Sequence, residues 1–133
     1  MSATPEQVAW LQRVQDQVNA ITYERDANAD AHDLWVDEPG IGTGFECRDY
    51  VLGKARLLRT QGWPAQDMSV VLVNDELGEY HAVLACKADD ETYILDNRTA
   101  SIYLWNAPVY PYKWLRQQIP GTVEFRDAST GLV

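Results

Sequence analysis

Cys47 is the residue best placed to act as a nucleophile, because the sequence predicts that it lies in the first turn of a helix. A glycine-rich run at residues 40–44 ends any preceding element, and apolar residues then recur at helical spacing until Gly62. A thiol in a first turn faces backbone N–H groups that lack intrahelical partners, and the positive end of the helix dipole. Both favour the thiolate, so this position suits a cysteine nucleophile.

His81 and Asp96 complete a candidate set with Cys47. His81 lies in EYHAVLACKA and Asp96 closes TYILD, and both runs are typical of β-strands. A cysteine from a helix start and a histidine and an aspartate from successive strands can meet at one edge of a sheet. In such a triad the histidine accepts the thiol proton and later protonates the leaving amine, while the aspartate holds the imidazole tautomer.

The order and spacing of these residues resemble the bacterial transglutaminase-like cysteine proteinases, whose best known members are periplasmic proteases that cut a surface adhesin. The resemblance covers most of the chain and rests on these segments: VNAITYERD (18–26), LW (34–35), ECRDY (46–50), YHAVLA (80–85) and YILDN (93–97). It implies that Cys47 is the nucleophile, His81 the base and Asp96 the orienting acid. It also implies one peptidase domain over residues 1–133.

The fold class that follows is α+β. The resemblance implies a papain-like or transglutaminase-core fold, in which the nucleophile helix packs on an antiparallel sheet and a further helix lies at the N-terminus. Thr4, Pro5 and Glu6 predict the start of that first helix, of about seventeen residues. Strands are expected in MSVVLVND, EYHAVLACKA, TYILDN, SIYLW and TVEFRDA. We assign no strand to the short segment KWLRQQ, which lies between the last two of these.

The alternation of strand residues gives one further expectation about His81. Ala82, Leu84 and Cys86 share one face of their strand, and His81 shares the other with its alternate neighbours. Because His81 must approach the nucleophile, we expect its face to be the one that the Cys47 helix covers.

Arg48 is a departure from the family pattern that bears on metal binding. The family usually has an acidic residue on each side of the cysteine, and members that need calcium use these acids as ligands. Here Glu46 precedes Cys47, but Arg48 follows it. A guanidinium removes an oxygen ligand and adds repulsion, so we expect no cofactor and no bound metal, with Glu46 and Asp49 as the remaining calcium candidates.

Trp35 and Asn97 are the candidates for the substrate groove or the oxyanion side. Trp35 lies in a long loop that leads to the nucleophile, and a tryptophan that fills the core from a loop is the alternative. Asn97 follows Asp96 and caps a turn in the alternative interpretation.

These residues predict a cysteine peptidase that cuts a protein or peptide substrate through a thioester acyl-enzyme. Two alternatives stay open at this point. The same thioester transferred to an amine would make the protein a transglutaminase or an amidase. A peptide-binding module that has kept the groove without catalysis is the other alternative.

Composition and charge limit the partners and the cellular location that we expect. Twenty acidic and eleven basic residues give a net charge of -9, which argues against a nucleic-acid partner. The N-terminal residues do not form a signal peptide, and no stretch has the length of a membrane span. We therefore expect a cytoplasmic or phage-associated protein without membrane insertion, of bacterial or phage origin. Both Cys47 and Cys86 are expected to be free thiols.

Overall fold

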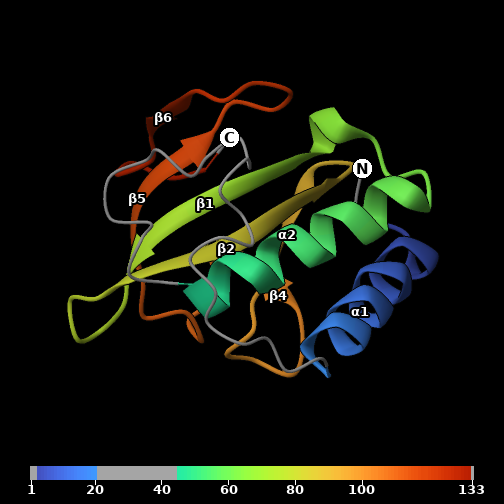
Figure 1. The fold of residues 1–133 in the computed structure, drawn as a ribbon, viewed down its shortest axis with the longest axis horizontal. Helices are drawn as coiled ribbons and strands as arrows, with labels where there is room; N and C mark the ends of the chain where they lie inside the picture. Colours follow the sequence, from blue (N-terminus) through green and yellow to red (C-terminus); the bar gives the residue numbers. More distant parts are fainter. Residues whose placement is uncertain (1–2, 21–44, 133) are drawn as a thin grey trace.

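Two helices and a six-stranded antiparallel sheet make up the part of the chain that the structure describes (Figure 1). The computed structural model describes residues 3–20 and 45–132, and side chains in the second range from residue 49. The elements are α1 (Pro5–Asn19), α2 (Phe45–Thr60), the 3-10 turn η2 (Ala65–Asp67), β1 (Met68–Asn74), β2 (Tyr80–Ala88), β3 (Glu91–Leu95), β4 (Tyr103–Leu104), β5 (Lys113–Gln118) and β6 (Phe125–Asp127). The expected α+β class is confirmed.

Helix α1 begins where the sequence predicts. The Thr4 side chain accepts a hydrogen bond from the Gln7 N–H, and the Gln7 side chain accepts one from the Thr4 N–H, which makes a capping box. Pro5 occupies the first helical position, where its missing N–H has no cost. This local chemistry fixes the start of the helix independently of the sheet.

Helix α2 ends in a Schellman motif. Gly62 has φ +102°, a conformation that residues with a Cβ rarely adopt. The Gly62 N–H donates to the Arg59 carbonyl, and the Trp63 N–H donates to the Leu58 carbonyl. Trp63 and Leu58 also pack together in the core, so the stop signal and the docking of the helix depend on the same residues.

The strand order is β4-β3-β2-β1-β5-β6, and all neighbouring pairs are antiparallel. Strands β1 to β4 follow one another along the sheet, and the chain then crosses to pair β5 with β1 (Figure 1). The KWLRQQ segment is therefore a strand beside the centre of the sheet, which the sequence analysis did not assign. SIYLW contributes only the short β4.

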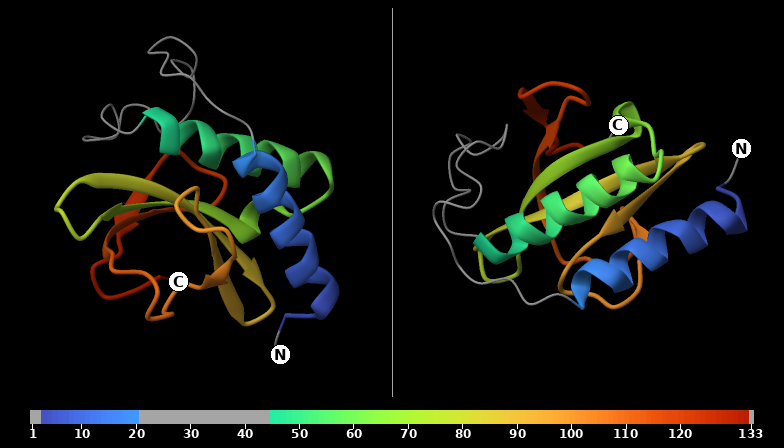
Figure 2. Two further views of the ribbon diagram at one scale, coloured as in Figure 1. Left: turned by 90° about the horizontal axis from the view of Figure 1, so that it is seen from below. Right: turned by 45° about the vertical axis from the view of Figure 1, so that its right-hand side comes forward.

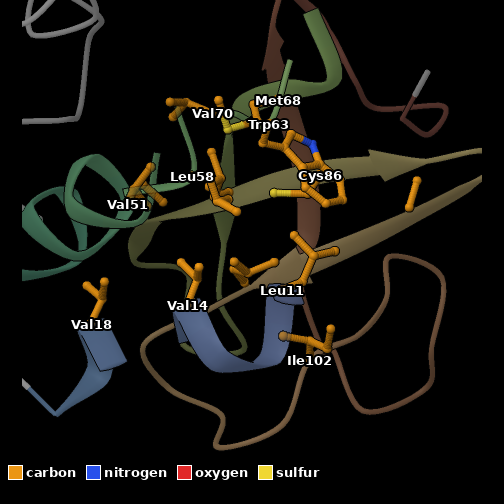
Figure 3. Packing of buried hydrophobic residues seen from close by; sticks show 14 of the residues in the cluster. Leu11, Val14, Val18, Val51, Leu58, Trp63, Met68, Val70, Cys86 and Ile102 are labelled. Atoms are coloured by element: carbon orange, nitrogen blue, oxygen red, sulfur yellow. The ribbon is translucent and has the colours of Figure 1, made fainter. Parts of the chain in front are cut away.

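Both helices lie on one face of the sheet (Figure 2). The main core fills the space between the helices and this face. Figure 3 shows Leu11 and Val14 of α1, Val51 and Leu58 of α2, and Cys86 of β2 pointing into this core. Neither described helix has the length and apolar content that a membrane span requires.

A second cluster lies on the opposite face of the sheet and corrects one expectation. Its members are Val71, Val73, Val83, Ala85, Ile94 and Tyr110, with Trp105, Ala107, Tyr112, Trp114 and Leu132 packed around them. Ala82, Leu84 and Cys86 belong instead to the helix-side core. The expectation that α2 covers the His81 face was therefore wrong: α2 covers the face of Cys86, because that face carries the larger apolar stripe.

Candidate active site

His81 and Asp96 lie in contact in the interior. His81 is the second residue of β2, and Asp96 directly follows β3. Their side chains meet with 2.8 Å between Nε2 of His81 and Oδ1 of Asp96, and the two residues are only 3% and 1% exposed. A buried imidazole and carboxylate at this distance form a charge-assisted pair when the imidazole is protonated.

The Asp96 carboxylate has a donor on each oxygen. Oδ1 also accepts the Arg98 N–H at 3.0 Å, and Oδ2 accepts the Tyr112 hydroxyl at 2.5 Å. Burial acts to raise the pKa of Asp96, but the hydrogen bond and charge of His81, together with the Tyr112 and Arg98 donors, hold that pKa below its usual value. Asp96 is therefore a carboxylate at neutral pH.

Helix α1 holds the backbone of Asp96. The Asp96 N–H donates to Oε1 of Gln15 at 2.9 Å, and the Asp96 carbonyl accepts from Nδ2 of Asn19 at 3.2 Å. Gln15 is fully buried and donates onward to the Thr99 carbonyl at 2.9 Å. The first helix thus positions the turn that carries the acid.

Lys54 brings a buried cation from α2 to the same network. Its Nζ donates to Oε1 of Gln15 at 2.9 Å, and the residue is 0% exposed. Burial lowers the pKa of Lys54 to about 8, although the charges of Asp96 and Cys86 act to raise it. One amide oxygen therefore links the helix of Cys47 to the strand end of Asp96.

A second ion pair supports the turn after Asp96. Nη1 of Arg98 lies 2.9 Å from Oδ2 of Asp75, and Oδ1 of Asp75 accepts the backbone N–H groups of Leu77 and Glu79. These bonds join the β1–β2 turn, which precedes His81, to the turn that follows Asp96.

Cys47 is the third residue of α2, in the first turn as the sequence predicts. Its side chain and those of Glu46 and Arg48 lie outside the described residues, as does the whole of Trp35. Asp49 is described and is half-buried. The fold brings His81 and Asp96 together and places Cys47 at the start of the helix that runs along β2.

Asn97 lies beside the pair without bonding to it. Its Oδ1 is buried and has no hydrogen-bond partner among the described residues. The turn after β3 is instead closed by Asp96, whose Oδ1 accepts the Arg98 N–H. Asp96 thus supplies the described side-chain acceptor in this turn.

Cys86, the other thiol, is a free cysteine at 0% exposure in the helix-side core. Burial raises the pKa of its thiol, and the charge of Lys54 offsets this only in part. Cys86 therefore stays protonated and unreactive in the folded protein, as expected for a structural cysteine.

A hollow of about 560 Å³ opens beside the start of β2. Its lining combines aromatic, aliphatic and charged side chains: Leu72, Tyr80, Leu115, Arg116, Phe125, Arg126 and Asp127. Tyr80, which precedes His81, is 48% exposed there. The hollow is large enough for one or two side chains of a bound peptide.

Sequence analysis did not assign Tyr112, Gln15 or Lys54 to the site. Tyr112 precedes a strand that the sequence analysis did not assign, and its partner cannot be inferred without the strand order. Lys54 did carry a signal, since it lies within the apolar spacing of Tyr50, Val51, Leu57 and Leu58. A lysine on the apolar side of a helix indicates a buried charge that needs a partner.

Comparison with known families decides the identity of the chain. The model of the bacterial transglutaminase-like cysteine proteinases, BTLCP, matches residues 1–125. The chain belongs to this family. A comparison with curated protein sequences found no significant match.

Solved structures similar to this BTLCP member include three of Legionella pneumophila LapG. One has 25% sequence identity and a TM-score of 0.61, and the match covers 83% of this chain. The matched region spans only 64% of that LapG chain. Calcium-bound LapG has 22% identity, a TM-score of 0.62 and coverage of 93% and 74% of the two chains. EGTA-treated LapG has 21% identity, the same TM-score and coverage of 92% and 72%. The expected transglutaminase-like fold is confirmed.

Calcium-bound LapG corrects the expectation that no cofactor is involved. The argument from Arg48 alone was wrong, because it judged one ligand position without the others that a calcium site recruits. Within the described residues, however, no group of three or more His, Cys, Asp or Glu side chains could hold a metal ion. Asp49 belongs to no such group.

Proposed function

We propose that this BTLCP member is a cysteine peptidase that hydrolyses a peptide bond in a protein substrate, with Cys47 as nucleophile, His81 as base and Asp96 as orienting acid. The observation that carries the proposal is the buried 2.8 Å contact between His81 and Asp96 in a chain of a cysteine proteinase family. A buried imidazole with a fixed carboxylate partner is the arrangement that activates a thiol.

In this proposal the two ring nitrogens of His81 have different tasks. Nε2 of His81 faces Asp96, so Nδ1 is the atom that exchanges protons with Cys47. Nδ1 takes the thiol proton, and the thiolate attacks the amide carbonyl to form a tetrahedral intermediate. As the C–N bond breaks, Nδ1 returns the proton to the leaving amine. Water then hydrolyses the thioester, and Nδ1 accepts a water proton and returns it to the Cys47 thiolate.

The oxyanion of the intermediate would bind near the first turn of α2. The Cys47 backbone N–H at the helix start is one donor in this proposal, since the first N–H groups of a helix have no intrahelical acceptor. The second donor would come from the loop before α2, near Trp35.

The hollow beside Tyr80 supports a polypeptide substrate. It opens on the helix side of the sheet beside Tyr80, and its mixed lining suits a side chain with both apolar and polar parts.

Thiol reactivity tests the proposal without a known substrate. The native protein is treated with limiting iodoacetamide at pH 6, once in calcium and once in EGTA, because LapG was solved in both conditions. Mass spectrometry then reports Cys47 and Cys86 separately. Preferential labelling of Cys47 that falls in His81→Ala is the expected result, and Cys86 serves as the internal control.

Equal labelling of the two thiols in the folded protein would overturn the proposal, as would a Cys47 rate that His81→Ala leaves unchanged. Cys47→Ala should also abolish hydrolysis of any substrate that the native protein cuts, without changing the thermal unfolding midpoint by more than about 2 °C.

A further inference from the structure

We propose that Tyr112 is a positioning residue of this site: its hydroxyl fixes the Asp96 carboxylate so that Oδ1 stays on Nε2 of His81. This inference rests on the proposed function. It adds a fourth residue to the set that the sequence predicts.

The contacts of Tyr112 are specific to the pair. Its hydroxyl lies 2.5 Å from Oδ2 of Asp96, the oxygen opposite the one that binds His81. Its ring lies beside the imidazole, with 5.5 Å between ring centroids and 53° between planes. Tyr112 therefore contacts both the acid and the base.

The hydrogen bond has a defined direction. Burial, with the charge of Asp96 and their hydrogen bond, raises the pKa of Tyr112 far above the neutral range, while the pKa of Asp96 is lowered. The phenol thus donates and the carboxylate accepts. Charge-assisted O–H···O⁻ bonds are short, as this one is.

The Asp96 carboxylate needs a second hydrogen-bond donor because rotation about the terminal torsion of an aspartate is only weakly restricted. Oδ1 is held by His81 and by the Arg98 N–H, and both contacts lie on one side of the group. Tyr112 is the described donor to Oδ2. Without it, the carboxylate can rotate away from Nε2, and the imidazolium loses its fixed partner.

The fold gives Tyr112 a rigid support. The crossover from β4 to β5 passes over the sheet face opposite the helices, and Tyr112 stacks there on Tyr110 with 5.7 Å between centroids. Lys113, the next residue, pairs with Asn74 of β1. The hydroxyl thus comes from the residue just before β5, outside the β2–β3 hairpin that carries His81 and leads to Asp96.

Tyr110 offers a matched control. It belongs to the same aromatic cluster and is more buried than Tyr112, but its hydroxyl donates to the Ile94 carbonyl at 3.2 Å. Tyr110→Phe and Tyr112→Phe each remove one hydroxyl from this cluster, and only the second removes a donor to Asp96.

The test is the pH dependence of Cys47 alkylation by iodoacetamide in the native protein and the two variants, at a temperature below all unfolding midpoints. The charged and titratable groups around Asp96 and Tyr112 are His81, Arg98, Tyr110 and Lys54, with Asp75 behind Arg98. All of them are retained in Tyr112→Phe, so a shift of the profile reports the lost hydroxyl.

We expect Tyr112→Phe to lower the Cys47 rate at pH 6 about tenfold, the effect of losing a hydrogen bond to a charged group, and to move the profile towards higher pH. Tyr110→Phe should stay within about twofold of the native rate. A native profile in folded Tyr112→Phe, or equal losses in both variants, would overturn the inference. If the native Cys47 is itself unreactive, or insensitive to His81→Ala, the proposed function fails instead.

Discussion

The side chains of His81 and Asp96 touch through Nε2 and Oδ1 at 2.8 Å, and both are shielded from solvent. This contact commits one ring nitrogen to the carboxylate and determines which nitrogen the proposal assigns to Cys47. It also favours the tautomer of His81 that is protonated at Nε2, because the opposite tautomer would place a lone pair against a carboxylate oxygen.

Asp96→Asn should therefore reduce turnover by roughly 10²- to 10⁴-fold, the range that general acid–base catalysis contributes. The amide can present N–H groups to Nε2, which favours the wrong tautomer. The rate of Cys47 alkylation at pH 6 measures the effect before a substrate is known. The exposed Glu76 provides the control Glu76→Gln, which removes a carboxylate that is open to solvent. A native alkylation rate in Asp96→Asn would remove Asp96 from the set.

Gln15→Leu should weaken both the fold and the site. The change leaves the Lys54 ammonium, the Asp96 N–H and the Thr99 carbonyl without this partner in the interior. A loss of about 2–4 kcal/mol in the free energy of unfolding is expected, since each buried group left unpaired costs about 1–3 kcal/mol. Urea denaturation measures it.

Gln12→Leu is the matched control for that experiment. Gln12 lies on the same helix and bonds to the backbones of Ala100 and Ile102, away from Asp96. A fall in Cys47 alkylation that is equal in the two variants, measured well below their unfolding midpoints, would show that Gln15 does not act through Asp96.

Lys54→Met should change how stability depends on pH. The folded-state pKa of Lys54 is about 8, below the unfolded value of 10.5, so the unfolded chain binds more protons between these pH values. Stability contributed by this residue thus rises as pH increases from 8 to 10.5, by about 3 kcal/mol at most. In Lys54→Met that rise should disappear.

Denaturation at pH 7, 8.5 and 10 checks this prediction, with the exposed Lys87→Met as control. At pH 7, Lys54→Met should be as stable as the native protein or more so, because apolar replacements of buried ions are often neutral or favourable. The same increase with pH in Lys54→Met and the native protein would show that Lys54 is not the titrating group.

Local signals in the sequence were sufficient for much of the fold. Thr4, Pro5 and Gln7 determine the start of α1, and Gly62 determines the end of α2, through bonds within a few residues. The fifteen-residue spacing of His81 and Asp96 spans a hairpin, so that His81 near the start of β2 meets Asp96 directly after β3. These features depend on short-range geometry, which a sequence displays directly.

The parts that could not be predicted depend on which strands become neighbours. The insertion of β5 beside β1 brings Tyr112 to Asp96, and no local pattern specifies that pairing. The helix-covered face of β2 was predicted wrongly for a related reason. Alternation shows that His81 and Cys86 face opposite ways, but it does not show which face the helices choose.

The edges of the described sheet have a consequence for how a substrate is recognised. They are formed by its shortest strands, β4 with two residues and β6 with three. Short edges offer few unpaired N–H and C=O groups, so they resist both self-association and the addition of a foreign strand. A peptide would gain little binding affinity at these edges from main-chain hydrogen bonds, which do not distinguish one sequence from another. Under the proposed function, discrimination among substrates would then depend on side-chain contacts.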